Sequence, residues 1–207
     1  MITKINHPLI QHKITLLRDK NTKSKDFRKI LREISMLMSF EATRNLKLSK
    51  TNITTNFGTA ECDEIKGKKL TLVPILRSGL EMCQGVQKLI PSAKIGHIGL
   101  YRDRFSNSTV EYYCKLPSDI SERDVFLLEP LISSGDKVNV AIQFIKNYNV
   151  KNITLISLIS SEIALKAIQE NHPDVNIYIA EIDNKFDTNG YLLPGIGDVA
   201  ARLYGTL

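Results

Sequence analysis

The stretch DVFLLEPLISSGDK, residues 124–137, decides the fold of this chain. It opens with a short apolar run between polar residues, which is typical of a strand buried in a parallel sheet. The run ends at Glu129 and passes through a Ser-Ser-Gly turn. Apolar residues then recur with helical spacing at Val138, Ala141, Ile142 and Ile145. The stretch therefore predicts a strand, a turn and a helix, in that order.

Further apolar runs of the same kind lie on both sides of this stretch. They are LTLVPIL at 70–76, IGHIGLY at 95–101, NITLISL at 152–158 and VNIYIAE at 175–181. A helical pattern opening at Ser160 or Ser161 separates the last two runs. Short strands that alternate with helices indicate βαβ crossovers. We therefore expect an α/β fold with a central, mainly parallel sheet flanked by helices.

The rest of the chain predicts elements around this sheet. Phe27, Ile30, Leu31, Ile34, Leu37 and Met38 share one helical face, which predicts a helix over about 25–46 capped by Thr22 or Ser24. The polar stretch at 50–61 predicts at most short, exposed strands. Residues 102–115 predict a hairpin that projects from the sheet rather than another core strand. No repeat or linker interrupts the chain, so we expect one domain over residues 1–207.

Composition excludes several classes of protein. Hydrophobic residues make up 43% and charged residues 24% of the chain, values that suit a globular protein and not a disordered, collagen-like or coiled-coil chain. No apolar stretch is long enough to cross a bilayer, and the first residues do not have the pattern of a signal peptide. These features predict a cytoplasmic protein with no membrane partner. Cys62, Cys83 and Cys114 are widely spaced, which favours neither a disulfide framework nor a zinc site.

The formal net charge of +6 predicts a polyanionic partner. This partner could be a nucleic acid or a small, heavily phosphorylated metabolite. Basic residues are densest between Lys13 and Arg32, but Asp19, Asp26 and Glu33 are interleaved with them. The interleaving favours a solvated helix face over a nucleic-acid footprint.

Candidate site residues follow the predicted strands, because ligands of open parallel sheets bind beyond the carboxyl ends of the strands. Residues 133–137 lie between a strand and a helix, where backbone N–H groups and hydroxyls can cradle a phosphate. Glu129 can accept hydrogen bonds from sugar hydroxyls. The same loop could equally be an ordinary helix cap.

Two further places have the same character. Arg77 follows the run at 70–76 and Arg102 follows the run at 95–101, so the pair could clamp a pyrophosphate, although each alone would suit a surface. The tail GYLLPGIGD at 190–198 could present backbone groups to a planar, neutral ligand. It could equally be a tight wrap against the core.

Taken together, these segments resemble uracil phosphoribosyltransferases nearly end to end. The matching blocks are NHPLIQHKITLLRDKNT at 6–22, EATRNL at 41–46, VPILRSGL at 73–80, KIGHIGLYRD at 94–103, VEYYCKLP at 110–117, HPDVNIYIA at 172–180 and GYLLPGIGD at 190–198. The resemblance implies a type I phosphoribosyltransferase fold with a small C-terminal hood for the base and a projecting hairpin arm. It also implies the family's reaction, in which uracil and 5-phosphoribosyl 1-diphosphate give UMP and pyrophosphate with Mg²⁺ present.

The resemblance also implies site residues by position. Contacts to the diphosphate donor are expected from Arg77, Arg102, Glu129, Ser133, Ser134, Gly135, Asp136, Lys137 and Asp198. Contacts to uracil are expected from Leu192, Gly197, Asp198 and Val199. Arg102 and Asp198 are the expected catalytic residues. The arm at 102–115 would shield the site and contribute to a homodimer or higher homo-oligomer, and GTP binding is a further expectation.

The chain departs from the family pattern in its phosphate loop, in its tail and at 160–164, where Ser-Ser-Glu-Ile-Ala stands in place of Ala-Ala-Pro-Glu-Gly. The family's phosphate loop reads Asp-Pro-Met-Leu-Ala-Thr-Gly-Gly-Ser, so Asp136 stands where the family has a glycine, adding a Cβ and a negative charge beside the expected phosphate. Lys137 could compensate. In the tail, Ala200 and Ala201 replace a glycine and a carboxylate. These changes predict weakened or altered substrate binding, and they leave open an enzyme for another base or a regulatory relative that binds nucleotide or RNA.

Overall fold

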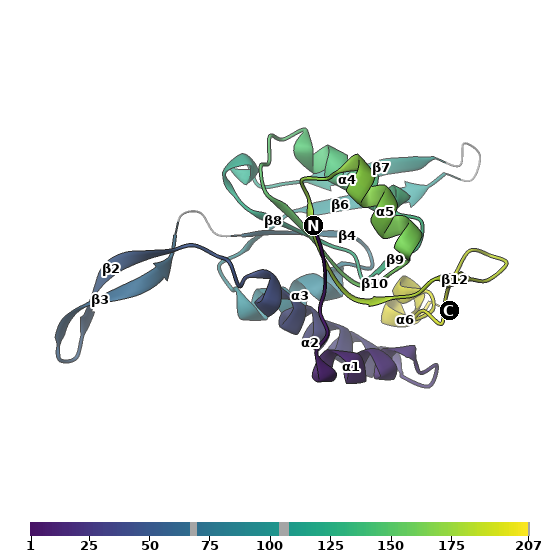
Figure 1. Ribbon diagram of the computed structural model, residues 1–207, viewed down its shortest axis with the longest axis horizontal. Helices are drawn as coiled ribbons and strands as arrows, with labels where there is room; N and C mark the ends of the chain where they lie inside the picture. Colours follow the sequence, from purple (N-terminus) through teal and green to yellow (C-terminus); the bar gives the residue numbers. More distant parts are fainter. Residues whose placement is uncertain (67–69, 104–107, 207) are drawn as a thin grey trace.

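A mainly parallel sheet lies at the centre of the chain. The computed structural model describes residues 1–66, 70–103 and 108–206. The strands of this sheet are β1 (Ile2–Lys4), β4 (Thr71–Leu76), β5 (Lys94–Ile95), β6 (His97–Arg102), β7 (Thr109–Lys115), β8 (Val125–Leu128), β9 (Leu131–Ile132), β10 (Ile153–Ser160) and β11 (Asn176–Ile182). Their order is β1-β11-β10-β8-β4-β6-β7, with β5 paired to β4 and β9 paired to β10 (Figure 1). Among the described residues every pair in this sheet is parallel except β6 with β7, which confirms the predicted sheet.

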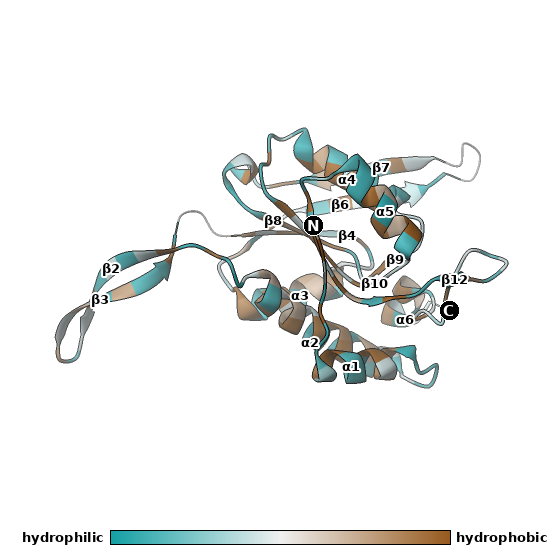
Figure 2. Cartoon of the chain, viewed as in Figure 1, coloured by the Kyte–Doolittle hydropathy of each residue, from teal (hydrophilic) through white to brown (hydrophobic). Residues whose placement is uncertain are grey.

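Helices cover both faces of the sheet, as predicted. One face carries α1 (Pro8–Arg18), α2 (Ser24–Ala42), α3 (Leu80–Leu89) and α6 (Val199–Tyr204), and the other carries α4 (Asp136–Lys146) and α5 (Glu162–Asn171) (Figure 1). A short 3-10 helix, η1 (Ile120–Glu122), precedes β8. The buried apolar side chains form one cluster on each side of the sheet. Figure 2 shows these apolar residues concentrated in the central strands and on the helix faces that meet them.

The structure corrects the predicted start and end of the long N-terminal helix. α2 begins at Ser24 and ends at Ala42, so it is shorter than the predicted 25–46. Its capping residue is Lys23, whose side chain makes no capping hydrogen bond. Neither predicted cap was right, because Ser24 is already helical and the Thr22 hydroxyl donates instead to the Leu16 carbonyl at 2.6 Å. The predicted start of α5 is confirmed, since the Ser161 hydroxyl accepts a hydrogen bond from the Ala164 amide at 2.9 Å.

A long hairpin projects from the body where the sequence predicted at most short strands. β2 (Leu48–Thr55) and β3 (Gly58–Ile65) have eight residues each and pair in antiparallel register from Leu48 with Ile65 to Thr55 with Gly58. Both faces of the hairpin are largely exposed, so polar residues occupy both and the alternation that normally marks a strand is missing. Figure 1 shows this hairpin extending away from the helices and the sheet.

The hairpin predicted over 102–115 is only partly a projecting arm. Residues 104–107 of this segment lie outside the described residues. β7 pairs with β6 along its whole length, from His97 with Lys115 to Arg102 with Thr109. Its side chains are partly or fully exposed, which confirms that it is not a core strand. It is instead the antiparallel edge of the central sheet.

None of the helices in the described ranges combines the length and the apolar character that a bilayer span requires.

The remaining elements shape the C-terminal tail. β12 (Lys185–Phe186) and β13 (Leu192–Leu193) form a small antiparallel sheet, and the chain then turns into α6. The Leu193–Pro194 peptide bond is cis, as is the Leu76–Arg77 bond after β4. The tail folds back toward the carboxyl ends of the central strands, near β9 and α6 (Figure 1).

Candidate active site

A cavity of about 230 Å³ lies between the carboxyl ends of the strands and the C-terminal tail. Its sheet side is lined by Ser78, Glu129, Leu131, Ser133 and Lys137. Its tail side is lined by Asn189, Gly190, Tyr191, Leu192, Gly197, Asp198, Val199 and Ala200. A second cavity of about 120 Å³ adjoins it, because it shares Glu129, Leu131, Ser133 and Lys137 and adds Ile132, Ser134, Gly135 and Val138. The site is where the rule for parallel sheets predicts it.

The loop between β9 and α4 forms the smaller cavity. Gly135 caps α4 with a φ of 86°, a backbone angle that residues with a Cβ rarely adopt, and no side chain caps the helix. The first N–H groups of α4 are therefore not occupied by a capping side chain and can face an anion. The loop therefore caps the helix through Gly135 without a side-chain hydrogen bond, and its role toward a phosphate stays a prediction.

Asp136 lies at the first position of α4, and its carboxylate engages the loop itself. The Ser134 hydroxyl donates a hydrogen bond of 2.9 Å to Oδ2 of Asp136. Both side chains are exposed, and Asp136 lines neither cavity. An anion entering the loop must therefore compete with the Asp136 carboxylate for the Ser134 hydroxyl and for the positive end of the helix.

Glu129 is the buried acid of the site, with 6% of its surface exposed. Its Oε1 accepts a hydrogen bond of 2.8 Å from the Ser78 hydroxyl, and its Oε2 has no hydrogen-bond partner in the described part of the chain. Burial raises the pKa of Glu129 to about 7, against the opposing effects of the Lys137 ammonium and the Ser78 hydrogen bond. Glu129 therefore offers an oxygen to the hydroxyl of a ligand, and its charge varies near neutral pH.

The tail is clamped to the end of α1 by a buried ion pair. Arg18 donates from Nη1 and Nη2 to the two carboxylate oxygens of Asp183, at 2.7 and 2.9 Å, and from Nη1 to the Gly195 carbonyl at 2.9 Å. The Gly195 amide donates to Asp183 at 3.0 Å. At Gly195 a Cβ would come within 2.1 Å of the Leu192 carbonyl oxygen, so only glycine fits. The tail is thus both a wrap against the core and one wall of the cavity, and the two alternatives were not exclusive.

Arg202 fixes the end of the tail in a similar way. Its guanidinium donates to the carbonyls of Ile196 at 3.0 Å, Asp19 at 2.7 Å and Leu17, and lies 4.2 Å from the centre of the Phe27 ring. Asp198 caps α6, with Oδ1 accepting from the Ala201 amide at 2.9 Å. The exposed Asp198 thus has one carboxylate oxygen in the helix cap while it lines the cavity.

Arg77 follows β4 and Arg102 is the last residue of the neighbouring β6, and neither arginine lines the cavity. β4 and β6 pair in parallel, with Leu76 opposite Gly99, so Arg77 and Arg102 leave the sheet at the same edge. Both side chains are exposed. Arg77 lies against Tyr204, whose ring centre is 5.2 Å from the guanidinium carbon and whose hydroxyl donates to the Arg77 carbonyl at 3.1 Å.

The structure therefore gathers most of the predicted site residues and adds others. Glu129, Ser133, Lys137, Leu192, Gly197, Asp198 and Val199 line the larger cavity, and Ser134 and Gly135 line the smaller one. Arg77, Arg102 and Asp136 line neither. Asn189 was missed, whereas Ser78 and Tyr191 lie in candidate segments but were not named as contacts. Ser78 stands beside Arg77 at a predicted strand end and could have been found there, whereas Asn189 carries no signal in the sequence.

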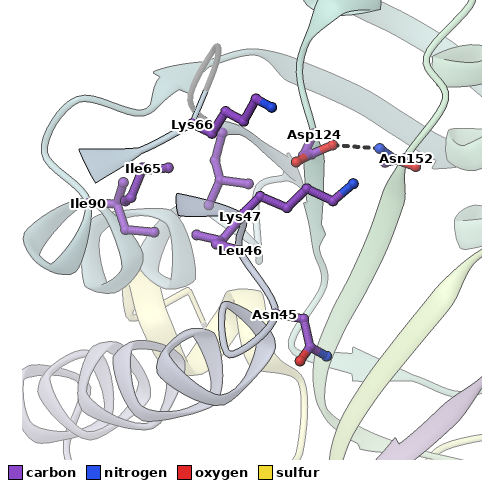
Figure 3. Close-up of a pocket in the computed structure, with 9 residues that line it drawn as sticks. Asn45, Leu46, Lys47, Ile65, Lys66, Ile90, Asp124 and Asn152 are labelled. Atoms are coloured by element: carbon purple, nitrogen blue, oxygen red, sulfur yellow. Dashed lines mark hydrogen bonds between the residues drawn. The ribbon is translucent and has the colours of Figure 1, made fainter. Parts of the chain in front are cut away.

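A larger cavity lies at the opposite edge of the sheet. It has a volume of about 310 Å³ and is lined by Asn45, Leu46, Lys47, Ile65, Lys66, Leu70, Ile90, Asp124 and Asn152 (Figure 3). The Asn152 side chain donates to the Asp124 carboxylate at 2.8 Å. This cavity lies at the amino ends of β4, β8 and β10, and no predicted site residue reaches it. Size alone does not make it the candidate site, because parallel sheets bind ligands at the other edge.

Comparison with known proteins links this chain to one family. The model of the family "Uracil phosphoribosyltransferase" matches residues 4–206. A uracil phosphoribosyltransferase of Alkaliphilus oremlandii is 52% identical over 205 residues, covering 99% of this chain and 98% of that protein. The solved structure of the AQ2163 protein from Aquifex aeolicus has a TM-score of 0.93 at 30% identity and covers 99% of this chain and 98% of its own. A hypoxanthine-guanine phosphoribosyltransferase of Bacillus anthracis shares the fold at a TM-score of 0.50 and 10% identity, over 77% of this chain and 80% of its own.

Proposed function

This chain belongs to the uracil phosphoribosyltransferase family, and we propose that its cavity joins uracil to 5-phosphoribosyl 1-diphosphate, giving UMP and pyrophosphate. Its fold is that of the type I phosphoribosyltransferases. The reaction is a pentosyl transfer of pyrimidine salvage. One observation carries the assignment of this site: a buried acid, a helix start that no side chain caps and a glycine-rich tail meet in adjoining cavities.

The tail is the part of the cavity suited to the base. Leu192 supplies a buried apolar side chain, and Gly197 and Val199 supply backbone near it. Uracil is planar and neutral, and backbone N–H and C=O groups can read its edge without a charged side chain. The ion pair of Arg18 with Asp183 holds this wall in place before the base arrives.

The sheet side is suited to the phosphorylated sugar. The first N–H groups of α4 and the hydroxyls of Ser133 and Ser134 can bind the 5-phosphate, with Lys137 close by. The free Oε2 of Glu129 can accept a hydrogen bond from a ribose hydroxyl. The position of Arg77 and Arg102 at the same sheet edge supports contacts from their guanidinium groups to a diphosphate that extends beyond the cavity.

In the reaction, the bond between the ribose anomeric carbon and the diphosphate breaks while a bond to a uracil nitrogen forms. Positive character develops on the sugar and negative charge on the leaving group. The protein holds the two reactants in line and stabilises these charges, and no covalent nucleophile is required. Asp198 and Arg102 are the residues we propose nearest the reacting groups, and Asp198 reaches them from the tail.

Mg²⁺ accompanies the diphosphate donor in this proposal. The described residues contain no group of three or more His, Cys, Asp or Glu side chains that could hold a metal ion. The carboxylates of Glu129 and Asp198 do line one cavity, which fits an ion bound largely through substrate oxygens and water. When bound, Mg²⁺ would neutralise charge on the departing diphosphate.

A homo-oligomer is a further part of the proposal. The support is the β2–β3 hairpin, because a two-stranded hairpin is marginally stable alone and this one exposes Leu48, Ile53 and Phe57. A second copy that covers the hairpin would bury them. Light scattering coupled to gel filtration should give at least twice the mass of one chain, and Phe57→Ser should lower that mass.

RNA binding receives less support. The basic stretch between Lys13 and Arg32 would be the footprint in this alternative, but three of its cations form ion pairs within the molecule. Lys13 pairs with Glu33 at 2.5 Å, Arg18 with Asp183 at 2.7 Å and Arg32 with Glu81 at 2.5 Å. Paired cations contribute less to a phosphate-backbone surface.

The deciding experiment mixes the protein with uracil, 5-phosphoribosyl 1-diphosphate and Mg²⁺ and follows UMP by chromatography. UMP must appear in proportion to the protein. A panel of free bases under the same conditions tests the acceptor, and another base that reacts faster would replace uracil in the proposal. If no base reacts while RNA is retained in a complex that weakens steeply with salt, the regulatory alternative replaces the enzyme.

A further inference from the structure

Tyr204, the last residue of α6, contacts Arg77 in two ways. The Tyr204 hydroxyl donates a hydrogen bond of 3.1 Å to the Arg77 carbonyl, and the Arg77 guanidinium carbon lies 5.2 Å from the centre of the Tyr204 ring. The first contact holds the backbone of Arg77 and the second favours one direction of its side chain. Within the described ranges no carboxylate pairs with Arg77. The Tyr204 ring is therefore the neighbour that orients the charged side chain of Arg77.

The other end of α6 forms part of the wall assigned to the base. Gly197, Asp198 and Val199 line the cavity at the start of this helix. The helix is packed firmly, because Val199 and Leu203 are buried and the Leu203 carbonyl accepts a hydrogen bond of 2.5 Å from Arg28. One short, anchored helix therefore connects the cavity wall to Tyr204.

We propose that Tyr204 is a positioning residue that sets Arg77 for the diphosphate and, through α6, links the base wall to the diphosphate arginine. The inference rests on the proposed function. The sequence analysis gave Tyr204 no role in positioning Arg77 or in linking it to the base wall. The residue also does not line the cavity. The ring and the hydroxyl make separable contributions, and each contact is worth a factor of about two to five in binding at an exposed position.

The test uses two variants of Tyr204. Tyr204→Phe keeps the ring and removes the hydroxyl, and Tyr204→Leu removes both contacts. We expect the KM for the diphosphate donor to rise about two- to fivefold in the first and about five- to twentyfold in the second. The kcat at saturating donor should change less than twofold. If Tyr204 had a purely structural role, the variants would lose kcat and melting temperature together. The donor KM would then not rise more in Tyr204→Leu than in Tyr204→Phe.

Two controls separate the arginine from general damage. Tyr178→Phe removes a hydroxyl on β11, in cavities that share no residue with the candidate site, and should leave the donor KM unchanged. In an Arg77→Ala background, Tyr204→Leu should add no further loss of donor affinity. The inference is overturned if Tyr204→Leu lowers donor affinity as much in the Arg77→Ala background as in the wild-type chain. It is also overturned if Tyr204→Leu alone leaves the donor KM unchanged.

Donor binding measured by calorimetry in Mg²⁺ keeps the inference apart from the proposed function. If the wild-type chain makes no UMP but binds the donor, the proposed function fails and the comparison of Tyr204 variants by calorimetry still decides the inference. If the wild-type chain makes UMP and the variants bind the donor as tightly as it does, only the inference fails.

Discussion

The Ser78 hydroxyl donates a hydrogen bond of 2.8 Å to Oε1 of Glu129 and so joins two strand ends that are far apart in sequence. The contact is possible because β4 and β8 are neighbours, with Pro74 opposite Leu128. The chain after β4 passes so close to β8 that a Cβ on Gly79 would lie 2.3 Å from the Leu128 carbonyl oxygen. Backbone packing therefore holds Ser78 against the buried acid, and Oε2 of Glu129 is left for a ligand.

Ser78→Ala should shift the acidic limb of the pH–rate profile to higher pH. The Ser78 hydrogen bond favours ionised Glu129, so its loss raises the pKa of Glu129 above about 7. At pH 7 we expect kcat/KM to fall about three- to tenfold, and the deficit should shrink toward pH 9. Ser78→Thr, which retains a hydroxyl, should restore most of the activity. A profile that is lower at every pH by the same factor would contradict this role.

Glu129→Gln should stabilise the protein above neutral pH while it weakens donor binding. The pKa of Glu129 is raised from 4.5 to about 7, so the folded state binds the extra proton and ionisation lowers stability as pH rises between these values. The loss of folding stability caused by ionised Glu129 is absent below pH 4.5 and complete above pH 7, where it is on the order of 3 kcal/mol. Thermal unfolding should show a gain of a few degrees at pH 8 and little at pH 5. Equal gains at both pH values would mean that ionisation is not the cause.

Asp136→Gly should improve donor binding at a cost in stability. The Asp136 carboxylate accepts from the Ser134 hydroxyl at 2.9 Å at the start of α4, where a phosphate would bind. Removing the charge should lower the donor KM about three- to tenfold. The glycine also gives up a favourable charge at the helix start, which costs about 1 kcal/mol. Asp136→Asn is the matched control, since it removes the charge and keeps the Cβ. An unchanged donor KM in both variants would show that the phosphate does not meet this carboxylate.

The sequence predicted the sheet because each buried strand was a short apolar run, and all of those runs formed strands. It did not predict the length of β2–β3, because both faces of that hairpin are solvated and no alternation marks it. It did not predict α1, α3 or α6. The sequence placed residues 190–198 near the base. It did not predict the ion pair of Arg18 with Asp183 that holds this tail, because the two residues lie more than 160 positions apart and no local pattern marks them.

The site was predictable to the extent that strand ends share one edge. Glu129 and the loop at 133–137 follow directly from that rule, and the cavity contains most of them. Arg77 and Arg102 leave the sheet at that edge, but whether an arginine lines a cavity depends on side-chain direction. In the case of Arg77 that direction is set by Tyr204, a contact that only the folded chain creates.

Arg18→Ala should loosen the base wall more than the phosphate loop. The Arg18 and Asp183 side chains are 22% and 5% exposed, so removing the arginine leaves a buried carboxylate whose remaining partner is the Gly195 amide. Breaking a buried pair costs about 3–5 kcal/mol, and partial exposure of Arg18 favours the lower end. We expect the uracil KM to rise at least tenfold, because small displacements of a positioning wall have large effects, and the donor KM to rise less than threefold.

Lys50→Ala is the matched control for this prediction. Lys50 pairs with Asp63 at 2.9 Å on the β2–β3 hairpin, where their side chains are 60% and 52% exposed. Exposed pairs contribute less than about 1 kcal/mol, so this variant should melt within a degree or two of the wild type and keep both KM values. Differential scanning calorimetry and initial rates at varied uracil check both variants. An equal rise in the KM of the donor and of uracil in Arg18→Ala would contradict the prediction. The ion pair of Arg18 with Asp183 would then support the whole site and not only its base wall, because its effect would reach a phosphate loop that Arg18 does not contact.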